Sequence, residues 1–297
     1  MQLDELRSHP AVSSRLQRPR GHREFVRISL SLRENHCALH CEVIPYLSLM
    51  KKHIPNLFTL GNMLCGMLAI LSFVEGAYLL GIILVGLAAF LDFFDGFVAR
   101  LLGVSGDLGK QLDSLADVVS FGVAPAIALM LTIQLNPFEC GSKSASEPLW
   151  CYSGPAIWTY IPLLIGLFSA YRLAKFNVDT RQSDRFIGLP TPANSILILS
   201  VVYTLEEGLL DFGFNTIFIG VCVLTVISCF LLVSEIPLLA LKFKNFKWKG
   251  NQARYLLILG SIIIFALSGI PGLAIVVLLY LLISIIDNRI HRHEVSR

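Results

Sequence analysis

Two stretches decide how this chain folds: LDFFDGFVAR at residues 91–100 and GKQLDSLAD at residues 109–117. They carry four aspartates, and the chain around them is largely apolar. A charged side chain near the centre of a bilayer costs roughly 3 kcal/mol or more. If the surrounding segments cross a membrane, these carboxylates need a ligand or a partner that compensates that cost.

The composition indicates a polytopic membrane protein. Of the 297 residues, 55% are hydrophobic and 15% are charged, and the mean hydropathy is +0.68. Ordinary soluble chains carry about 25% charged residues, so a water-soluble fold of this composition could not cover its own surface. The net charge of +3 is too small to indicate a nucleic-acid partner, and the seven scattered cysteines form neither a zinc pattern nor a disulfide framework.

Eight apolar segments follow Met50, each close to the roughly 20 residues that cross about 30 Å of hydrocarbon. They lie near residues 54–74, 76–101, 114–135, 155–176, 193–210, 214–240, 254–269 and 271–287. The fifth is the weakest, because acidic residues crowd its end. The last two are divided by Gly-Ile-Pro-Gly at 269–272, which is typical of a tight helical hairpin. We therefore predict an all-α, polytopic membrane helical bundle of about eight transmembrane helices.

The chain divides into three parts by composition. Residues 1–49 are polar and contain no apolar run long enough to span a bilayer, so we expect a disordered tail or an upstream extension that is not translated. Residues 50–241 form the main membrane domain. Residues 242–297 comprise a basic loop, two further transmembrane helices and a cytoplasmic tail. The basic and aromatic run at 242–249 is expected to lie on the anionic membrane surface.

The loops predict the orientation of the bundle. Lys and Arg gather before the first span, after the second and fourth, between the sixth and seventh, and at the C-terminus. The alternate loops are acidic, with Lys143 as their only cation. By the positive-inside rule both termini face the cytoplasm, as do the stretches at 91–100 and 109–117.

The four aspartates have helical spacing. Asp92 and Asp95 are three residues apart, and Asp113 and Asp117 are four apart, so each pair projects from one face of its helix. Two such pairs facing each other would repel unless cations lay between them. Oxygen-only ligand sets select hard ions such as Mg²⁺ or Mn²⁺. The alternative is that these acids are helix caps or ion-pair with neighbouring basic residues, but buried carboxylates at this regular spacing favour a ligand.

The two stretches also resemble a known family. Their fixed residues match, without gap or substitution, the pattern D-x2-D-G-x2-A-R-x8-G-x3-D-x3-D of the CDP-alcohol phosphatidyltransferases: Asp92, Asp95, Gly96, Ala99, Arg100, Gly109, Asp113 and Asp117. The resemblance implies a membrane-embedded, all-helical enzyme, commonly a homodimer. Such enzymes transfer a phosphatidyl group from a CDP-linked lipid to an alcohol and release CMP.

Stretches outside this pattern resemble the phosphatidylserine synthase branch of the family. They are PNLFTLGN at 55–62, VVSFGVAP at 118–125, RLAKFN at 172–177, FIGLPTPA at 186–193 and VSEIP at 233–237. This resemblance implies CDP-diacylglycerol as donor and L-serine as acceptor, in the inner membrane of a bacterial cell with membrane lipids as further partners. Glycerol 3-phosphate or inositol phosphate is the alternative acceptor, and either would need a more basic pocket.

Two alternatives lie outside the family. A transporter would also be polytopic and carry intramembrane carboxylates, but it usually shows repeated halves or broken helices near the midplane. A prenyltransferase of the membrane aspartate-rich type would bind Mg²⁺ and pyrophosphate, but we would expect a second acidic motif, and none follows Asp117.

The resemblance assigns roles to the acids. Asp92, Asp95 and Asp113 would hold two divalent ions, Mg²⁺ or Mn²⁺. Asp117 is the best candidate for a shared metal ligand that is also the general base, taking the proton from the serine hydroxyl as it attacks the β-phosphorus. The sequence shows no Ser/His/Asp or Cys/His nucleophile arrangement, which favours direct displacement over a covalent intermediate.

The remaining candidate residues surround the two substrates. The CDP-lipid is expected to lie against Asn56, Thr59, Gly96, Ala99, Arg100 and Gly109. For Arg100 the alternative is snorkelling to the interface, and for Asn56 it is a helix N-cap. The carboxylate of serine needs a cation, and the candidates are Arg172, Lys175 and Arg181, of which Arg172 lies deepest. Their alternative role is orientation of the bundle by the positive-inside rule.

Overall fold

The computed structural model describes residues 53–104, 106–134, 157–178, 186–210, 212–239 and 251–295. These ranges belong to one compact unit, Lys52–Arg297. The expected N-terminal tail at 1–49, the basic run at 242–249 and Arg181 lie outside the described residues.

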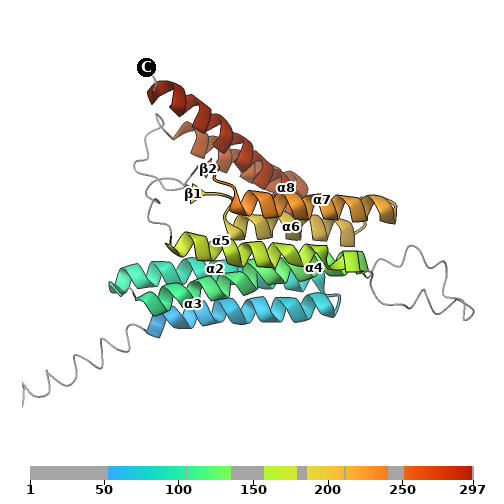
Figure 1. Cartoon of the computed structure of the whole chain (residues 1–297), viewed down its shortest axis with the longest axis horizontal. Coiled ribbons are helices and arrows are strands. Elements are labelled where there is room, and N and C mark those ends of the chain that lie inside the picture. The colour runs from blue at the N-terminus through green and yellow to red at the C-terminus, as the bar shows by residue number, and fades with distance from the viewer. Residues whose placement is uncertain are drawn as a thin grey trace, which may run out of the picture. The chain divides into compact units, whose positions relative to one another are not determined.

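The described residues are almost entirely helical, which confirms the predicted all-α class. The first helix is His53–Val74. It is followed by α2 (Tyr78–Leu102), α3 (Asp107–Asp117), the π-helix η1 (Val118–Val123), α4 (Ala124–Gln134), the 3-10 helix η3 (Ile157–Leu163), α5 (Leu164–Val178), α6 (Thr191–Glu206), α7 (Phe214–Val233) and α8 (Gln252–Val295). Two short strands, β1 (Phe186–Ile187) and β2 (Pro237–Leu238), pair antiparallel. Figure 1 shows the helices running side by side, with α8 beyond α6 and α7.

Six helices of the described part are long and apolar enough to cross a membrane. They are His53–Val74, Tyr78–Leu102, Asp107–Ile133, Ile157–Val178, Asn215–Val233 and Gln252–Arg289. The third combines α3, η1 and α4, and the fourth combines η3 and α5. Each lies where an apolar segment was predicted. The fifth predicted segment corresponds to α6, which at 16 residues is shorter than these six helices.

A kink at Gly269 divides α8. Gly269 has φ 60° and ψ −141°, a conformation that a residue with a Cβ rarely adopts. The two halves then fold back on each other. A Cβ at Gly260 would lie only 2.9 Å from Leu279 Cδ2, and Leu257 and Ile283 share one buried cluster. The Gly-Ile-Pro-Gly turn therefore makes the helical hairpin that its sequence predicts.

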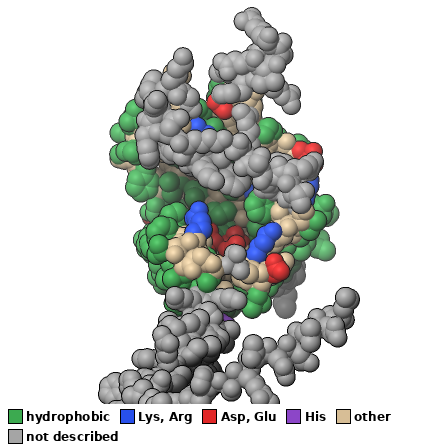
Figure 2. Space-filling model, turned by 90° about the vertical axis from the view of Figure 1, so that its left-hand side faces the viewer, with side chains coloured by type: hydrophobic (Ala, Val, Ile, Leu, Met, Phe, Trp, Pro, Cys, Tyr) green, Lys and Arg blue, Asp and Glu red, His purple; other side chains and the backbone are tan. Residues whose placement is uncertain are grey.

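The outward face of α2 is apolar. Leu79, Ile83, Leu87 and Phe90 are each about half exposed, and they follow one another at helical spacing. Figure 2 shows hydrophobic side chains along the flanks of the bundle. Exposed apolar flanks of this kind suit contact with lipid chains.

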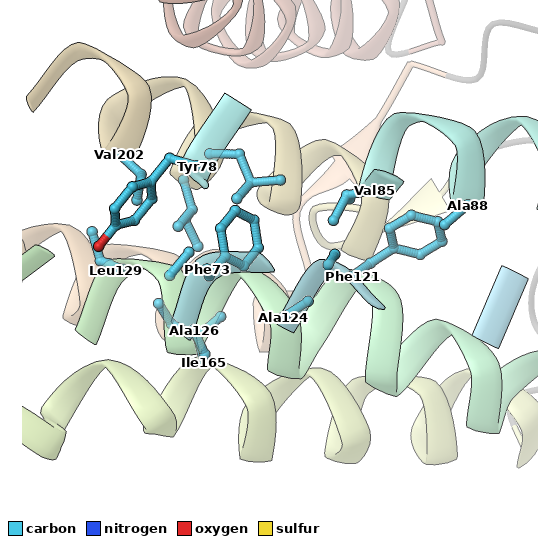
Figure 3. Close-up of a cluster of buried hydrophobic side chains, with 14 of the residues drawn as sticks. Phe73, Tyr78, Val85, Ala88, Phe121, Ala124, Ala126, Leu129, Ile165 and Val202 are labelled. Atoms are coloured by element: carbon cyan, nitrogen blue, oxygen red, sulfur yellow. The ribbon is translucent and has the colours of Figure 1, made fainter. Parts of the chain in front are cut away.

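The buried core joins the first helix, α2, η1 and the helices α4 to α7. Phe73, Val85, Phe121, Leu129 and Ile165 lie in one cluster (Figure 3). Small residues let the helices approach closely: a Cβ added to Gly66 would overlap Ser120, and one added to Gly122 would lie 2.9 Å from Ser169 Cβ. Close approach through small residues is how helices pack in membranes. These contacts fix η1, and the aspartates just before it, against the first helix and α5.

Candidate active site

The four aspartates come together between α2 and α3. Asp92, Asp95 and Asp113 each offer a carboxylate oxygen, and these atoms all lie within 4.8 Å of one another. The carboxyl of Asp117 lies within hydrogen-bonding reach of that of Asp92. Asp95 and Asp117 are 7% and 9% exposed. The two pairs thus face each other, in addition to projecting from single helix faces as their spacing predicts.

The first helix holds both pairs in place. Thr59 Oγ1 donates a 2.6 Å hydrogen bond to Asp95 Oδ2, and Asn62 Nδ2 donates a 3.4 Å hydrogen bond to Asp117 Oδ1. Thr59 and Asn62 are three residues apart, so they lie on one helix face. Ser120 Oγ in η1 in turn donates to the carbonyl oxygen of Asn62. The orientation of the acids therefore depends on a helix some 36 to 55 residues earlier in the chain.

Asn62 is a site residue to which sequence reasoning gave no role. It is fully buried, and its Oδ1 has no hydrogen-bond partner among the described residues. The available signal was an amide in a membrane helix, one turn after Thr59 and on the same face. Polar residues in such positions are costly and point to function.

Several residues predicted to contact the CDP-lipid lie close to the acids. A Cβ at Gly96 would meet nothing within 4 Å, so open space lies beside Asp95. A Cβ at Gly109 would lie 3.3 Å from Asn56 Oδ1, which places the Asn56 side chain over Gly109. Because Asn56 lies inside the helix His53–Val74, it is not an N-cap there.

Ala99 and Arg100 are the other predicted CDP-lipid residues on α2. The Arg100 Nε donates a 2.9 Å hydrogen bond to the Gly96 carbonyl oxygen, and the side chain is exposed. Ala99, one residue earlier on α2, is half-buried. The guanidinium of Arg100 is therefore held over Gly96, beside which the open space lies.

Arg172 of α5 lies near the last of the four aspartates, Asp117. Its side chain is 8% exposed, and it interacts electrostatically with Asp117 and with Tyr280 of α8. Its guanidinium carbon is 5.9 Å from the centre of the Phe176 ring. The Arg172 Nε has no hydrogen-bond partner within the described ranges, and neither does Ser169 Oγ one turn earlier on α5. A buried donor without a partner costs about 1–3 kcal/mol, a cost that a bound polar ligand would remove.

The other predicted cations differ from Arg172 in setting. Lys175 Nζ lies 3.2 Å from Glu235 Oε1, in an ion pair whose side chains are 36% and 66% exposed. Arg181 is outside the described residues. Arg172 is thus the buried cation that the structure brings to the acid cluster.

The site opens at one end of the bundle. Figure 2 shows acidic side chains at the bottom of a hollow in this end, with basic side chains on either side and hydrophobic side chains around them. A hollow with acids at its base and basic groups at its rim suits a ligand that carries phosphates and reaches the site together with metal ions.

A π-helical turn follows the last aspartate directly. Residues Val118–Val123 form η1, and Ser120, Phe121 and Gly122 in it are buried. Such turns are rare and often lie at functional sites. Asp117 is the last residue of α3, and the turn that follows it packs between the first helix and α5. Nothing in the helical periodicity of the segment predicts it.

The family model of the CDP-alcohol phosphatidyltransferases matches residues 52–231. The chain belongs to this family. Its membership confirms the prediction made from the spaced aspartates, and it decides against the transporter and the prenyltransferase. The match ends before α8, so the last helical hairpin lies outside it.

Three curated relatives illustrate the similarity. The CDP-diacylglycerol–serine O-phosphatidyltransferase of Helicobacter pylori (strain J99) is 33% identical, over 78% of this chain and 89% of the relative. The enzyme of the same name from Bacillus subtilis (strain 168) is 34% identical, over 66% of this chain and 92% of the relative. The archaetidylserine synthase of Methanothermobacter thermautotrophicus is 32% identical, over 51% of this chain and 58% of the relative.

Proposed function

We propose that the protein transfers the phosphatidyl group of CDP-diacylglycerol to the hydroxyl of L-serine, giving phosphatidylserine and CMP. The observation that carries this proposal is the buried Arg172 beside Asp117. Among the described residues it is the one buried Lys or Arg, which suits a single carboxylate better than the phosphate of glycerol 3-phosphate or inositol phosphate. The relatives from H. pylori and B. subtilis, which carry the name of a serine O-phosphatidyltransferase, support the same acceptor.

The acid cluster fits two divalent cations. Carboxylate oxygens of three aspartates within 4.8 Å of one another repel strongly without cations between them, and oxygen-only ligands suit Mg²⁺ or Mn²⁺. Asp92, Asp95, Asp113 and Asp117 would hold the ions. When bound, such ions neutralise charge on the pyrophosphate and on the CMP leaving group.

Asp117 takes the proton of the acceptor. Its side chain is oriented by Asn62 and lies beside Arg172, so it stands between the metal-binding acids and the acceptor side. As the serine oxygen forms its bond to the β-phosphorus, the bond from that phosphorus to the oxygen bridging to CMP breaks. The hydroxyl proton passes to the Asp117 carboxylate, and CMP leaves with the bonding electron pair. The transfer is a direct displacement, with no covalent enzyme intermediate.

The donor lies on the side of Gly96. We place the pyrophosphate and ribose in the open space beside Gly96, with Ala99 and Arg100 on the same helix. Asn56 over Gly109 and Thr59 on Asp95 line the opposite wall. Arg100, held by the Gly96 carbonyl oxygen, offers its terminal nitrogens to a phosphate.

Serine binds through its carboxylate. Arg172 donates to that carboxylate, a charge-assisted hydrogen bond that is among the stronger kinds. We also assign Lys175 and Arg181 to the group of cations that attract the serine carboxylate. Because Lys175 pairs with Glu235, its contribution to serine binding requires that this exposed ion pair opens.

The proposed bundle crosses the membrane eight times. The six long helices are joined by α6, whose 16 residues span about 24 Å, and α8 counts twice because of its kink at Gly269. Both termini and the acid cluster then face the cytoplasm of a bacterial cell, in its inner membrane. Labelling of single cysteines placed at residues 75 and 106 tests this: residue 106 should react only from the cytoplasmic side, and residue 75 only from the outside.

The proposal includes the division of the chain into a tail at 1–49, a catalytic membrane domain at 50–241 and a C-terminal part at 242–297. It also includes a homodimer, for which the exposed apolar face of α2 offers a surface. Crosslinking in native membranes should trap a species of twice the chain mass.

CMP release tests the proposed reaction. Purified protein receives CDP-diacylglycerol and Mg²⁺, with serine, glycerol 3-phosphate or inositol phosphate added separately, and Asp117→Asn is the control. Serine alone should drive CMP release, and the control should lose it. Release driven by either phosphate acceptor would leave the family in place and overturn the serine assignment.

A further inference from the structure

Three polar residues of α8 form hydrogen bonds with the backbone of β2 and of Leu239, the residue that follows it. Tyr280, Ser284 and Asn288 are spaced four residues apart, so they lie on one face of the helix. The Tyr280 hydroxyl donates to the Leu239 carbonyl oxygen at 3.1 Å, and Ser284 Oγ accepts from the Leu239 N–H at 3.2 Å. Asn288 Nδ2 donates to the Pro237 carbonyl oxygen. We call these three residues the α8 ladder.

The segment held by the ladder connects the residues before α6 with those after α7. β2 pairs with β1, which leads into α6, and the Gly188 N–H donates to the Ile236 carbonyl oxygen at 3.0 Å. Gly188 has φ 73°, and a Cβ there would lie 2.8 Å from the Ser234 carbonyl oxygen. The close fit leaves the residues before α6 little freedom to move independently of those after α7.

The same segment reaches α5 through Glu235. Its carboxylate pairs with Lys175, which lies three residues after Arg172 on α5. A chain of contacts therefore runs from the α8 ladder through β2 and Glu235 to the helix that carries Arg172.

Tyr280 also lies close enough to Arg172 for their charges to interact. The Tyr280 ring packs against the buried cluster of Leu189, Leu197 and Leu238. Among the described residues, the titratable groups that interact electrostatically with Arg172 are Asp117 and Tyr280. Tyr280 thus belongs to the surroundings of the buried arginine although it lies beyond the residues that the family model matches.

We infer that the α8 ladder positions the acceptor side of the site. In it, Tyr280 binds the backbone of Leu239 just after β2 and also interacts with Arg172. The inference rests on the proposed function, in which Arg172 binds the serine carboxylate. Tyr280 is a positioning residue, since it acts through Arg172 and the β2 segment. Binding of the amino-acid acceptor then depends on α8, whereas binding of the CDP-lipid on the side of Gly96 does not.

The test is steady-state kinetics of the full-length protein carrying Tyr280→Phe. This change removes the hydroxyl bond to Leu239 and keeps the ring packing. Loss of one hydrogen bond should raise the KM for serine about three- to tenfold, with kcat and the KM for CDP-diacylglycerol within about twofold of wild type. Ser284→Ala should give the same split. The matched control is Tyr171→Phe, which alters a 60% exposed tyrosine next to Arg172 and should change neither KM.

A second readout separates positioning from mere stability. Serine methyl ester lacks the carboxylate, so the wild type should prefer serine strongly, and Tyr280→Phe should narrow that preference. Equal changes in both KM values, a fall in kcat alone, or an unchanged preference would overturn the inference and leave the proposed function intact. Absence of serine-dependent CMP release from the wild type would overturn both.

Discussion

Thr59 Oγ1 donates a 2.6 Å hydrogen bond to Asp95 Oδ2, between residues 36 positions apart. The bond joins the first helix to the more buried acid of the α2 pair, and the Thr59 hydroxyl is itself 3.2 Å from the Pro55 carbonyl oxygen. One Asp95 oxygen is therefore fixed by the protein. In the proposed site, the metal geometry depends on this residue of a neighbouring helix.

Thr59→Val should weaken metal binding while it keeps the shape of the side chain. Loss of a hydrogen bond that orients a metal ligand typically costs 10–100-fold in metal affinity or activity. We expect the Mg²⁺ concentration for half-maximal CMP release to rise about tenfold or more, with the KM for serine unchanged. Thr59→Ser, which keeps the hydroxyl, is the matched control. A normal Mg²⁺ dependence of Thr59→Val would contradict the role of this bond.

Metal removal should be visible in stability as well as in activity. A ligand that binds only the folded state raises the melting temperature. We expect Mg²⁺ or Mn²⁺ to raise the Tm of the detergent-solubilised protein after chelation, and to restore CMP release. Asp113→Asn removes one of the three clustered carboxylates and should abolish the Tm shift. Equal shifts in the wild type and this variant would place the bound ions elsewhere.

Alanine should affect donor binding at one glycine of the site and stability at another glycine. A Cβ at Gly96 meets open space, whereas one at Gly66 would overlap Ser120. Gly96→Ala should therefore fold normally and raise the KM for CDP-diacylglycerol, because the methyl group enters the donor space. Gly66→Ala should destabilise the protein by about 1–3 kcal/mol, as overpacking does. Thermal unfolding beside donor kinetics checks both, and an unchanged donor KM in Gly96→Ala would move the donor away from this face.

Substitutions of Arg172 and of Lys175 should differ sharply in their effect on the KM for serine. A hydrogen bond to a charged group contributes about 1.5–3 kcal/mol, so Arg172→Gln should raise the KM for serine by roughly 10- to 100-fold. Lys175→Gln breaks an exposed ion pair, which typically contributes about 1 kcal/mol or less, and should raise that KM by less than about fivefold. Saturation curves for serine at fixed CDP-diacylglycerol measure both. A larger effect at Lys175 would reassign the carboxylate partner.

Local patterns predicted much of this fold and site. The apolar segments correspond in place to the described helices, and the i, i+3 and i, i+4 spacing of the aspartates predicted that the two pairs project from single helix faces. Eight fixed positions in residues 92–117 predicted the family that the match over 52–231 confirms. These features depend on neighbours within one or two helical turns, which a single sequence contains.

What could not be predicted depends on contacts between distant segments. The bond from Asn62 to Asp117 joins residues 55 positions apart, and the bond from Tyr280 to Leu239 crosses 41 positions. Helical spacing gives the face on which Tyr280, Ser284 and Asn288 lie, but not the segment that packs there. The π-helical turn after Asp117 likewise reflects how η1 fits between Gly66 and Ser169. Such features follow from packing of the whole bundle.

The most direct test of the account is to follow the serine oxygen into the product. Purified protein is given CDP-diacylglycerol, Mg²⁺ and serine labelled with ¹⁸O in its hydroxyl, and the lipid and CMP are analysed by mass spectrometry. We expect phosphatidylserine that retains the label, unlabelled CMP in equal amount, and neither product from Asp117→Asn. CMP released without labelled phosphatidylserine, or full activity of Asp117→Asn, would contradict the proposed mechanism.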